Sequence, residues 1–258
     1  MIFENQGAEC SGACANTDAF SVRMAFQPVV DVETRSIYAY EALVRGPNGE
    51  GAGHVLAAVN ETNRYAFDQA CRVKAISTAA RLGMRQRLNI NFLPNAVYHP
   101  EACLKLTLAA AEEHGFPRHL ITFEFTEDER IIDRGHLKAI IDTYRRHNFL
   151  TALDDFGAGY AGLALLADFQ PDYLKIDRCL VDGIDRDKAR QAIVAGVMLT
   201  ASQLGMFAVA EGVERPEEVA FLRALGIRFF QGFLFAKPVI GKLAGAEDIP
   251  WHVLSEQG

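Results

Sequence analysis

The sequence predicts an α/β protein in which eight strands and the helices between them form one (β/α) barrel. Apolar runs of strand length alternate with segments of helical period from Met24 almost to the end of the 258 residues. No internal repeat or break in composition divides the chain, and 50% of its residues are hydrophobic. A chain of this length and composition can bury a large core, which excludes a disordered or fibrous protein.

The first two strands are expected to form an antiparallel hairpin. They are the apolar runs 24–32 and 36–44, and only the short polar turn Glu33-Thr34-Arg35 separates them. A helical crossover between parallel strands needs a much longer connection, so these two runs must pair in opposite directions. Six further runs complete the count of eight strands: 87–92, 120–125, 149–153, 173–176, 207–210 and 228–230.

Helices are predicted between these strands from apolar spacings of three and four residues. In 137–144 the spacing places Leu137, Ile140, Ile141 and Tyr144 on one face. Pro216 and the two glutamates after it favour a helix start, and Gly226 favours its end. Two further helices are predicted to end near Gly83 and Gly205, with these apolar stripes: Ala66, Ala70, Val73, Ile76 and Ala80 in one, and Ile193, Val197, Ala201 and Leu204 in the other.

The charge balance excludes partners that need a basic surface. The chain has 26 Lys and Arg against 33 Asp and Glu, a net charge of −7. No global positive field attracts duplex nucleic acid or anionic lipid, so an anionic ligand must be captured locally. The uncharged stretch 191–210 contains several polar residues, and we interpret it as a buried helix followed by a strand rather than a membrane span.

The cysteines and the first residues indicate a cytoplasmic protein. The five cysteines are odd in number and lack zinc-ribbon or CxxC spacing. The first 20 residues carry acidic but no basic side chains, unlike a signal peptide. We expect 1–20 to be a flexible tail, 21–245 the barrel and 246–258 a C-terminal tail. Cys10 and Cys14 lie in the first tail, where an unstructured segment is favoured over a redox or metal site.

Polar side chains stand at the ends of successive predicted strands. In a (β/α) barrel the carboxyl ends of the strands meet at one mouth, where the chemistry takes place. A single acidic residue after a strand is most often a helix cap, and Asp177 and Glu214, which precede helices, keep that interpretation. The remaining strand-end residues are Glu41, Asn89 and Asn91, Glu124, Asp154 and Asp155, Lys175, Glu211 and Gln231, with Glu127 three positions after Glu124.

Several carboxylates around one mouth predict divalent cations. Buried together they would repel one another strongly unless cations neutralise them. Carboxylate and amide oxygens favour Mg²⁺ or Mn²⁺, whereas the seven histidines do not end the strands. The adjacent Asp154 and Asp155, followed by Gly157 and Gly159, can bridge two metals of the kind used for in-line attack on a phosphodiester. Arg45, four residues after Glu41, can bind a phosphate through its planar guanidinium.

These residues, in this order, resemble the EAL-domain family, the cyclic di-GMP phosphodiesterases. The signature Glu41-Ala42-Leu43-Val44-Arg45 is weak alone, but an ordered set of blocks accompanies it between about residues 22 and 240. The blocks are Phe26-Gln27-Pro28, Asn89-Ile90-Asn91-Phe92, Phe123-Glu124-Phe125-Thr126-Glu127, Asp154-Asp155-Phe156-Gly157, Leu174-Lys175-Ile176-Asp177, Ala210-Glu211-Gly212-Val213-Glu214, and Gln231-Gly232 with Pro238.

The resemblance implies a modified TIM (β/α)8 barrel with an antiparallel first strand. It also implies hydrolysis of cyclic di-GMP to linear pGpG by in-line attack of a metal-activated water, with Mg²⁺ or Mn²⁺ as cofactor and Ca²⁺ as inhibitor. The implied metal ligands are Glu41, Asn91, Glu124, Asp154, Asp155 and Glu211. Lys175 is similar to the residue that orients the water, Glu211 to a base, and Gln231 to a support of this network.

Further roles follow from the same resemblance. Arg45 corresponds to a phosphate contact and Gln27 to a weaker substrate contact. Glu127 is similar to the anchor of the Asp155 loop, which in the family couples the site to dimerisation. A homodimer is therefore expected, and a separate regulatory protein is one of several ways in which such a chain can be controlled.

Two other functions stay open at this point. Some relatives of the family have lost catalytic residues and act as cyclic di-GMP receptors or protein adaptors. A carboxylate-rich barrel can also be an enolase-type lyase that uses Mg²⁺ with Lys175 as the base. Strand-end spacing alone does not identify the substrate, although the Asp154-Asp155 pair favours two metals and phosphate chemistry.

Overall fold

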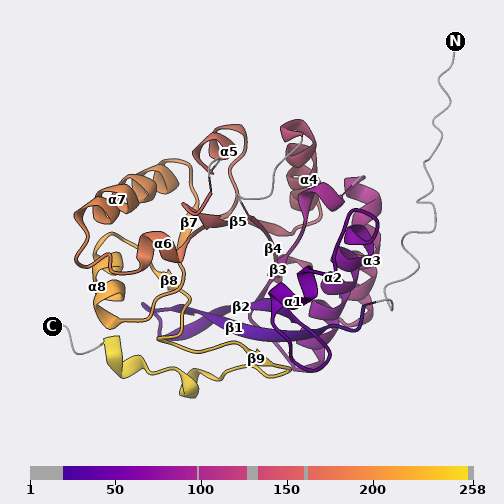
Figure 1. Cartoon of the computed structure of the whole chain (residues 1–258), viewed down its shortest axis with the longest axis horizontal. Coiled ribbons are helices and arrows are strands. Elements are labelled where there is room, and N and C mark those ends of the chain that lie inside the picture. Colours follow the sequence, from indigo (N-terminus) through magenta and orange to yellow (C-terminus); the bar gives the residue numbers. More distant parts are fainter. Residues whose placement is uncertain (1–19, 98, 127–132, 160–161, 255–258) are drawn as a thin grey trace, which may run out of the picture.

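The structure is a computed structural model that describes residues 20–97, 99–126, 133–159 and 162–254. Strands β1 to β8 close into a ring in the order β2-β3-β4-β5-β6-β7-β8-β1, and β1 pairs again with β2. Helices surround the ring on the outside (Figure 1). This arrangement confirms the predicted barrel with its alternating helices, a modified TIM (β/α)8 barrel.

The strands lie within a few residues of their predicted positions. β1 is antiparallel to both β2 and β8, which confirms the predicted antiparallel hairpin. Strands β2 to β8 all run parallel to one another. A short ninth strand, which the sequence patterns did not indicate, pairs with β1 at Ala25 and Phe26. The strands are β1 (Arg23–Asp31), β2 (Ser36–Arg45), β3 (Arg87–Asn91), β4 (Ile121–Thr126), β5 (Leu150–Phe156), β6 (Tyr173–Ile176), β7 (Phe207–Ala210), β8 (Phe229–Phe230) and β9 (Val239–Ile240).

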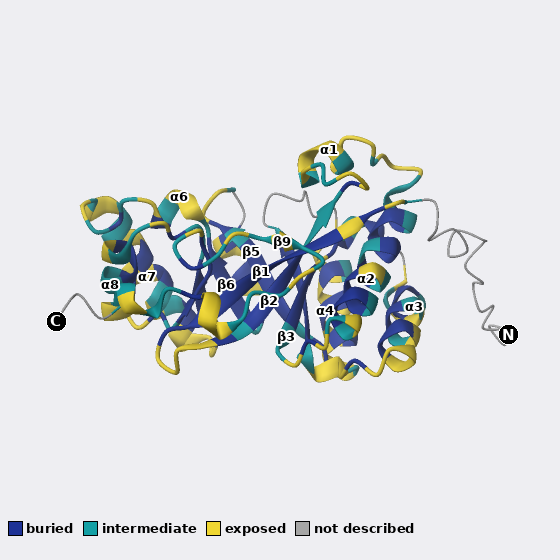
Figure 2. Cartoon of the chain, turned by 90° about the horizontal axis from the view of Figure 1, so that it is seen from below, coloured by how far each residue is buried: buried dark blue, intermediate teal, exposed yellow. Residues whose placement is uncertain are grey.

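The helices pack their buried faces against the outside of the ring, and exposed residues occupy the outer surface (Figure 2). They are α1 (Ala52–Leu56), α2 (Arg64–Arg81), α3 (Pro100–Glu113), α4 (Arg134–Arg146), α5 (Gly162–Asp168), α6 (Arg178–Val181), α7 (Lys188–Gln203) and α8 (Pro216–Ala224). All four predicted apolar positions of α4 are buried. The helix predicted after Pro216 is α8, which has proline in its first turn.

Two predicted helix faces differ from the observed ones. In α7 the buried residues are Val194, Val197 and Ala201, while Ile193 is 50% and Leu204 38% exposed. Val194 lies next to Ile193, so a rotation of about 100° gives an equally good apolar spacing. In α2 the buried face includes the charged pair Asp68 and Arg72, and a pattern of apolar residues alone does not predict this burial.

The end of the described chain lies against the barrel. In the 246–258 segment, expected to be a tail, Ile249 is buried and the Trp251 ring packs 6.4 Å from that of Phe235. The expected N-terminal tail, with Cys10 and Cys14, falls almost entirely outside the described residues. Among the helices of the described ranges, none has the length and apolarity needed to cross a bilayer.

Candidate metal centre

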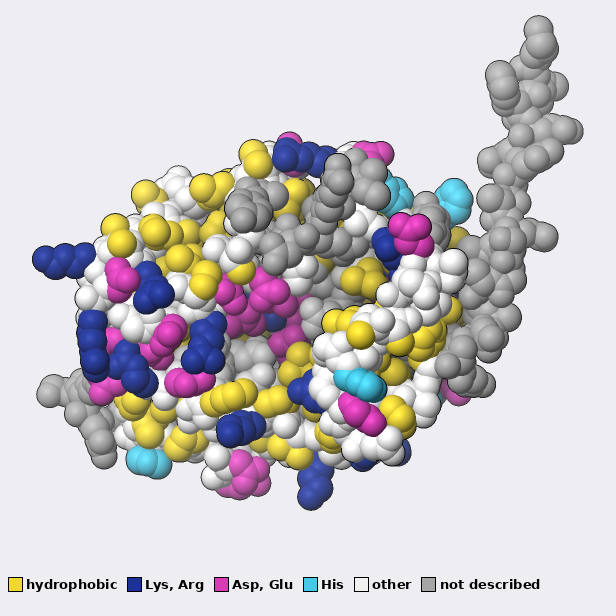
Figure 3. Space-filling view, viewed as in Figure 1, with side chains coloured by type: hydrophobic (Ala, Val, Ile, Leu, Met, Phe, Trp, Pro, Cys, Tyr) yellow, Lys and Arg dark blue, Asp and Glu magenta, His cyan; other side chains and the backbone are white. Residues whose placement is uncertain are grey.

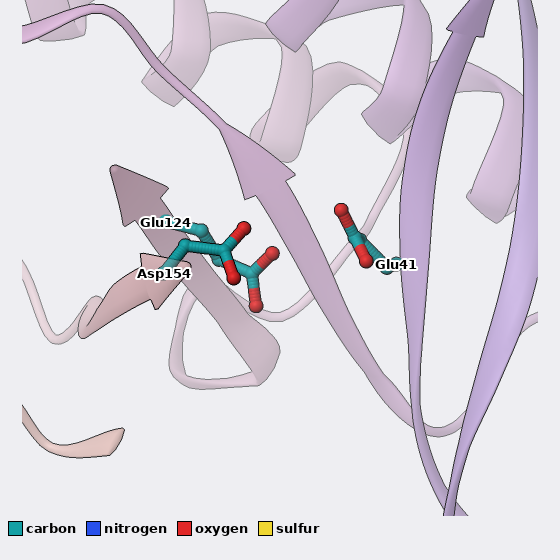
Figure 4. A group of neighbouring side chains, drawn as sticks. All are labelled: Glu41, Glu124 and Asp154. Atoms are coloured by element: carbon teal, nitrogen blue, oxygen red, sulfur yellow. The ribbon is translucent and has the colours of Figure 1, made fainter. Parts of the chain in front are cut away.

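The barrel interior changes from apolar to polar toward its mouth. A lower layer consists of six residues that pack on one another: Val29, Ala39, Ala152, Tyr173, Val209 and Phe229. Residues two apart on a strand share a face, so Glu41, Asp154 and Lys175 lie one layer above Ala39, Ala152 and Tyr173. Acidic side chains accordingly gather in the central hollow of the molecule (Figure 3). Glu41 faces Glu124 and Asp154 across this layer (Figure 4).

The ammonium group of Lys175 lies among four of the carboxylates and is only 1% exposed. Its Nζ lies 2.7 Å from Glu211 Oε1, 3.0 Å from Glu124 Oε2, 3.0 Å from Asp154 Oδ1 and 3.5 Å from Glu41 Oε2. Burial by itself lowers the pKa of Lys175, but these four carboxylates together raise that pKa well above its usual value. Lys175 therefore keeps its positive charge at the centre of the layer.

The carboxylates outnumber this one cation. Burial raises the pKa of Glu124 and of Glu211 well above the usual value, and Asp154 adds to both shifts, although Lys175 opposes them. Burial, followed by the charge of Asp154, raises the pKa of Asp155 to about 6. These directions show that the ionised site lacks positive charge.

Side-chain amides complete the layer from β1, β3 and the end of β8, which place no acid at this level. Asn91 Nδ2 donates to Glu41 Oε1 at 2.8 Å, and Gln231 Nε2 donates to Glu41 Oε2 at 2.7 Å and to Gln27 Oε1 at 3.2 Å. Asn89 Nδ2 donates to Glu124 Oε1 at 2.8 Å, so Asn89, expected at this strand end beside Asn91, contacts a carboxylate of the site. Its spacing of two residues from Asn91 places both side chains on one face of β3.

A local break in β5 brings Asp154 and Asp155 to the same side. The β5–β6 register shifts between Leu153 and Phe156, and Asp155 adopts a φ of 54°, in the left-handed region that non-glycine residues seldom occupy. The backbone N–H of Asp155 donates to Asp154 Oδ1 at 3.0 Å. Strained backbone of this kind concentrates at functional sites, and here it turns two successive carboxylates toward one pocket.

The oxygen donors form two overlapping groups that fit divalent cations. Oxygens of Glu41, Glu124 and Asp154 lie within 4.8 Å of one another, and so do those of Asp154, Asp155 and Glu211. Asp154 belongs to both groups, which is the property of a ligand shared by two ions. All these donors are carboxylates, and no histidine or cysteine of the described ranges joins them, so the set suits a hard cation.

Other predicted residues lie around this centre. Arg45 ends β2 and donates through Nη1 to the Val44 carbonyl at 2.8 Å. Asp177 caps α6 by accepting from the Cys179 N–H, as predicted. The prediction that Glu214 caps a helix is wrong, because Arg215 is the N-cap of α8 and Glu214 pairs with Arg178 at the surface. Glu127 lies outside the described residues.

A hollow of about 440 Å³ opens beside the carboxylates. Glu41, Asn91, Asp154 and Asp155 line its polar side. The rest of its wall is mainly apolar and comes from β2, α1, α2, β3 and the residues after β3. It includes Leu43, Val44, Leu56, Phe67, Ile90 and Leu93. The acidic centre therefore borders a space that can receive an organic ligand.

Residues 13–238 match the EAL domain family, and the chain belongs to that family. A standalone EAL protein from Vibrio cholerae O395, solved in a c-di-GMP bound form, is 50% identical with a TM-score of 0.85, and the match covers 88% of this chain and 95% of that one. BlrP1 of Klebsiella pneumoniae, solved as a manganese and cy-diGMP complex, is 36% identical with a TM-score of 0.81, over 86% of this chain and 57% of that one.

Curated relatives include both enzymes and regulators. The blue light- and temperature-regulated antirepressor BluF of Escherichia coli is 31% identical over 93% of this chain. The cyclic di-GMP phosphodiesterase PdeL of the same species is 37% identical over 47% of this chain. The chain spans 59% of the length of BluF and 33% of the length of PdeL, so it corresponds to one part of these proteins.

Proposed function

We propose that the protein hydrolyses one phosphodiester bond of cyclic di-GMP and releases linear pGpG, and that it uses two divalent cations, Mg²⁺ or Mn²⁺. The observation that carries this proposal is the pair of carboxylate groups that share Asp154. Every acidic and amide position that the family resemblance identifies in the described residues is filled by the expected residue type. Solved family members contain cyclic di-GMP, in one case with manganese, which supports both the substrate and the cofactor.

The protein's own residues would hold the cations through Glu41, Asn91, Glu124, Asp154, Asp155 and Glu211. When bound, such cations lower the pKa of water and neutralise the negative charge that grows on the phosphoryl oxygens. The raised pKa values of Glu124, Glu211 and Asp155 support this assignment, because positive charge is what these carboxylates lack.

Lys175 and Glu211 would act on the attacking water. The Lys175 ammonium lies 2.7 Å from Glu211 Oε1 and is held by three further carboxylates. With cations bound to those carboxylates, one of its three N–H groups would be free to donate to the water and orient it. Glu211, as an acceptor with a raised pKa, takes the proton of that water while the oxygen attacks phosphorus in line. The bond from phosphorus to the ribose 3′ oxygen breaks, and this oxygen takes up a proton from solvent water to leave as the hydroxyl of pGpG.

The remaining residues would bind the substrate and keep the donors in place. Gln231 orients Glu41 through its amide, and Gln27 in turn accepts from Gln231. Arg45 would contact a phosphate oxygen, because a guanidinium matches the geometry of a phosphate. Glu127 would anchor the Asp155 loop, and the protein would act as a cytoplasmic homodimer, with a separate regulatory protein as one route of control.

A second candidate is a receptor or adaptor that binds cyclic di-GMP without hydrolysing it. The similarity to BluF, which is named an antirepressor, favours this alternative. It requires a site that binds the dinucleotide but fails to activate water. The filled positions around Lys175 make hydrolysis the better supported of the two functions.

Chromatography of the products formed from cyclic di-GMP, with and without Mn²⁺, tests the proposal. We expect pGpG only with the metal, and its formation to fall at least about 100-fold in Glu41→Gln, because that variant lacks a ligand charge. Glu112→Gln, an exposed change on α3, is the control and should keep full activity. Binding of cyclic di-GMP without pGpG would support the receptor, and full activity of Glu41→Gln would contradict the proposed centre.

A further inference from the structure

A buried ion pair lies beside the acidic centre but is not one of its ligands. Asp68 and Arg72 stand one turn apart on α2, and their carboxylate and guanidinium groups meet at 2.7 Å. The side chains are 1% and 0% exposed. Asp68 also lines the same hollow as Glu41 and Asn91.

Aromatic side chains as well as Asp68 surround the charge of Arg72. Its guanidinium carbon lies 5.1 to 5.8 Å from the ring centres of Phe92, Phe123 and Tyr144, and Nη1 donates to the Tyr144 hydroxyl at 2.8 Å. Apolar residues of similar size often replace such a buried pair without loss of stability. Any role of the pair beyond stability must come from the other contacts of Asp68.

Asp68 connects the pair to the end of β3. Its Oδ1 accepts from the backbone N–H of Leu93 at 3.0 Å, just past the last residue of the strand. On the other side, the N–H of Phe92 donates to the Glu124 carbonyl at 2.9 Å. These two hydrogen bonds clamp the segment that follows Asn91, whose amide reaches Glu41.

We propose that Asp68 is a positioning residue that fixes the exit of β3, so that the Asn91 side chain keeps its contact with Glu41. The inference rests on the proposed function for its link to metal binding. Its structural part, the effect of Asp68 on Asn91, concerns the metal-free protein as well.

Two double variants isolate the hydrogen bond from the ion pair. Asp68→Asn/Arg72→Met and Asp68→Leu/Arg72→Met both lack the pair, but only the asparagine oxygen can still accept from Leu93. Calorimetry should give a dissociation constant for Mn²⁺ that is about 10- to 100-fold larger in the leucine variant than in the asparagine variant. Asp68→Ala/Arg72→Met, which leaves the hollow unfilled, should resemble the leucine variant.

Side-chain amide NMR of the metal-free protein gives a second readout. The Asn91 NH₂ resonances, assigned by their loss in Asn91→Asp, should keep their position in the asparagine variant and move in the leucine and alanine variants. Tyr144→Phe is the control, because it removes the bond to Arg72 and spares the one to Leu93. It should lower the melting temperature without changing the Mn²⁺ dissociation constant.

Equal Asn91 resonances and equal Mn²⁺ affinity in all the double variants would overturn the inference. A Tyr144→Phe variant that loses as much Mn²⁺ affinity as the leucine variant would also overturn it, because the effect would then follow stability. If the unmodified protein does not bind Mn²⁺, the proposed function fails, while the Asn91 resonances still decide the structural part.

Discussion

Replacement of Lys175 by methionine is expected to lower the free energy of unfolding of the metal-free protein by about 3 to 5 kcal/mol. The lysine is the one cation within 4.0 Å of the carboxylates of Glu41, Glu124, Asp154 and Glu211 among the described residues. Without it, these buried groups must take up protons or remain ionised without a partner, and both alternatives destabilise the fold.

The magnitude follows from the geometry of Lys175. Each charge pair at about 3 Å contributes about 5 kcal/mol of attraction at an effective dielectric constant of 20, and desolvation of the ions offsets most of that sum. Methionine has a similar length and leaves little cavity, so the loss reports on the charge. Since the pKa of Lys175 is raised, its contribution is complete below the unfolded pKa of about 10.4 and is lost only as pH rises through the folded value.

Urea denaturation in EDTA and in Mn²⁺ provides the assay. Mn²⁺ at a thousandfold excess over the dissociation constant of the unmodified protein adds about 4 kcal/mol to that protein. At the same Mn²⁺ concentration the gain should be larger in Lys175→Met, because no ammonium competes with the ion. Lys138→Met is the control: Lys138 pairs with Asp142 at 2.7 Å, but both side chains are about half exposed, so the loss should stay below about 1 kcal/mol. A metal-free Lys175→Met variant within about 1 kcal/mol of the unmodified protein would refute the reasoning.

Two further changes test other parts of the barrel. Burial raises the pKa of Asp31, but the hydrogen bond from Arg228 and neighbouring backbone N–H groups lower it overall, from 3.8 to about 2. Asp31→Asn should therefore cost about 1 to 2 kcal/mol at pH 7, and the difference, followed by urea denaturation, should shrink as pH falls below 3.8 toward 2. Gly232→Ala would place a Cβ 2.1 Å from the Val213 carbonyl oxygen, so its melting temperature and pGpG formation should fall, whereas Gly196→Ala, with no atom within 4 Å, should melt unchanged or higher. A Gly232→Ala variant that melts with the unmodified protein would contradict this close approach.

The sequence could predict the strands and most of the centre because the barrel has a strict two-residue period. The apolar runs locate the strands, and the lower layer of Ala39, Ala152 and Tyr173 places the polar residues two positions later at the mouth. The same period would point Asp154 and Asp155 to opposite faces, and the prediction that both serve one site rests instead on their adjacency and the glycines that follow. In the structure this arrangement occurs where the β5–β6 register shifts and Asp155 adopts a positive φ.

The missed features depend on contacts between distant segments. Helical spacing favoured an apolar stripe on α2, whereas Asp68 and Arg72 are buried through Leu93 and Tyr144, which lie far away in the chain. The short strand β9 forms because β1 extends past β8 and offers free edge positions there. The local sequence pattern therefore indicates neither the burial of Asp68 and Arg72 nor the strand β9.

The antiparallel β1 determines which kinds of side chain surround Glu41. Because β1 runs against its neighbours, Gln27 comes two residues before its lower-layer residue Val29 and pairs in register with Glu41. Asn91 and Gln231 donate to the two oxygens of Glu41, and Gln27 accepts from Gln231. Amides at this seam hold the carboxylate without adding negative charge, whereas acids there would increase the repulsion that one buried lysine already opposes. The uneven placement of acids and amides around the ring is therefore a condition for a centre that folds before it binds its cations.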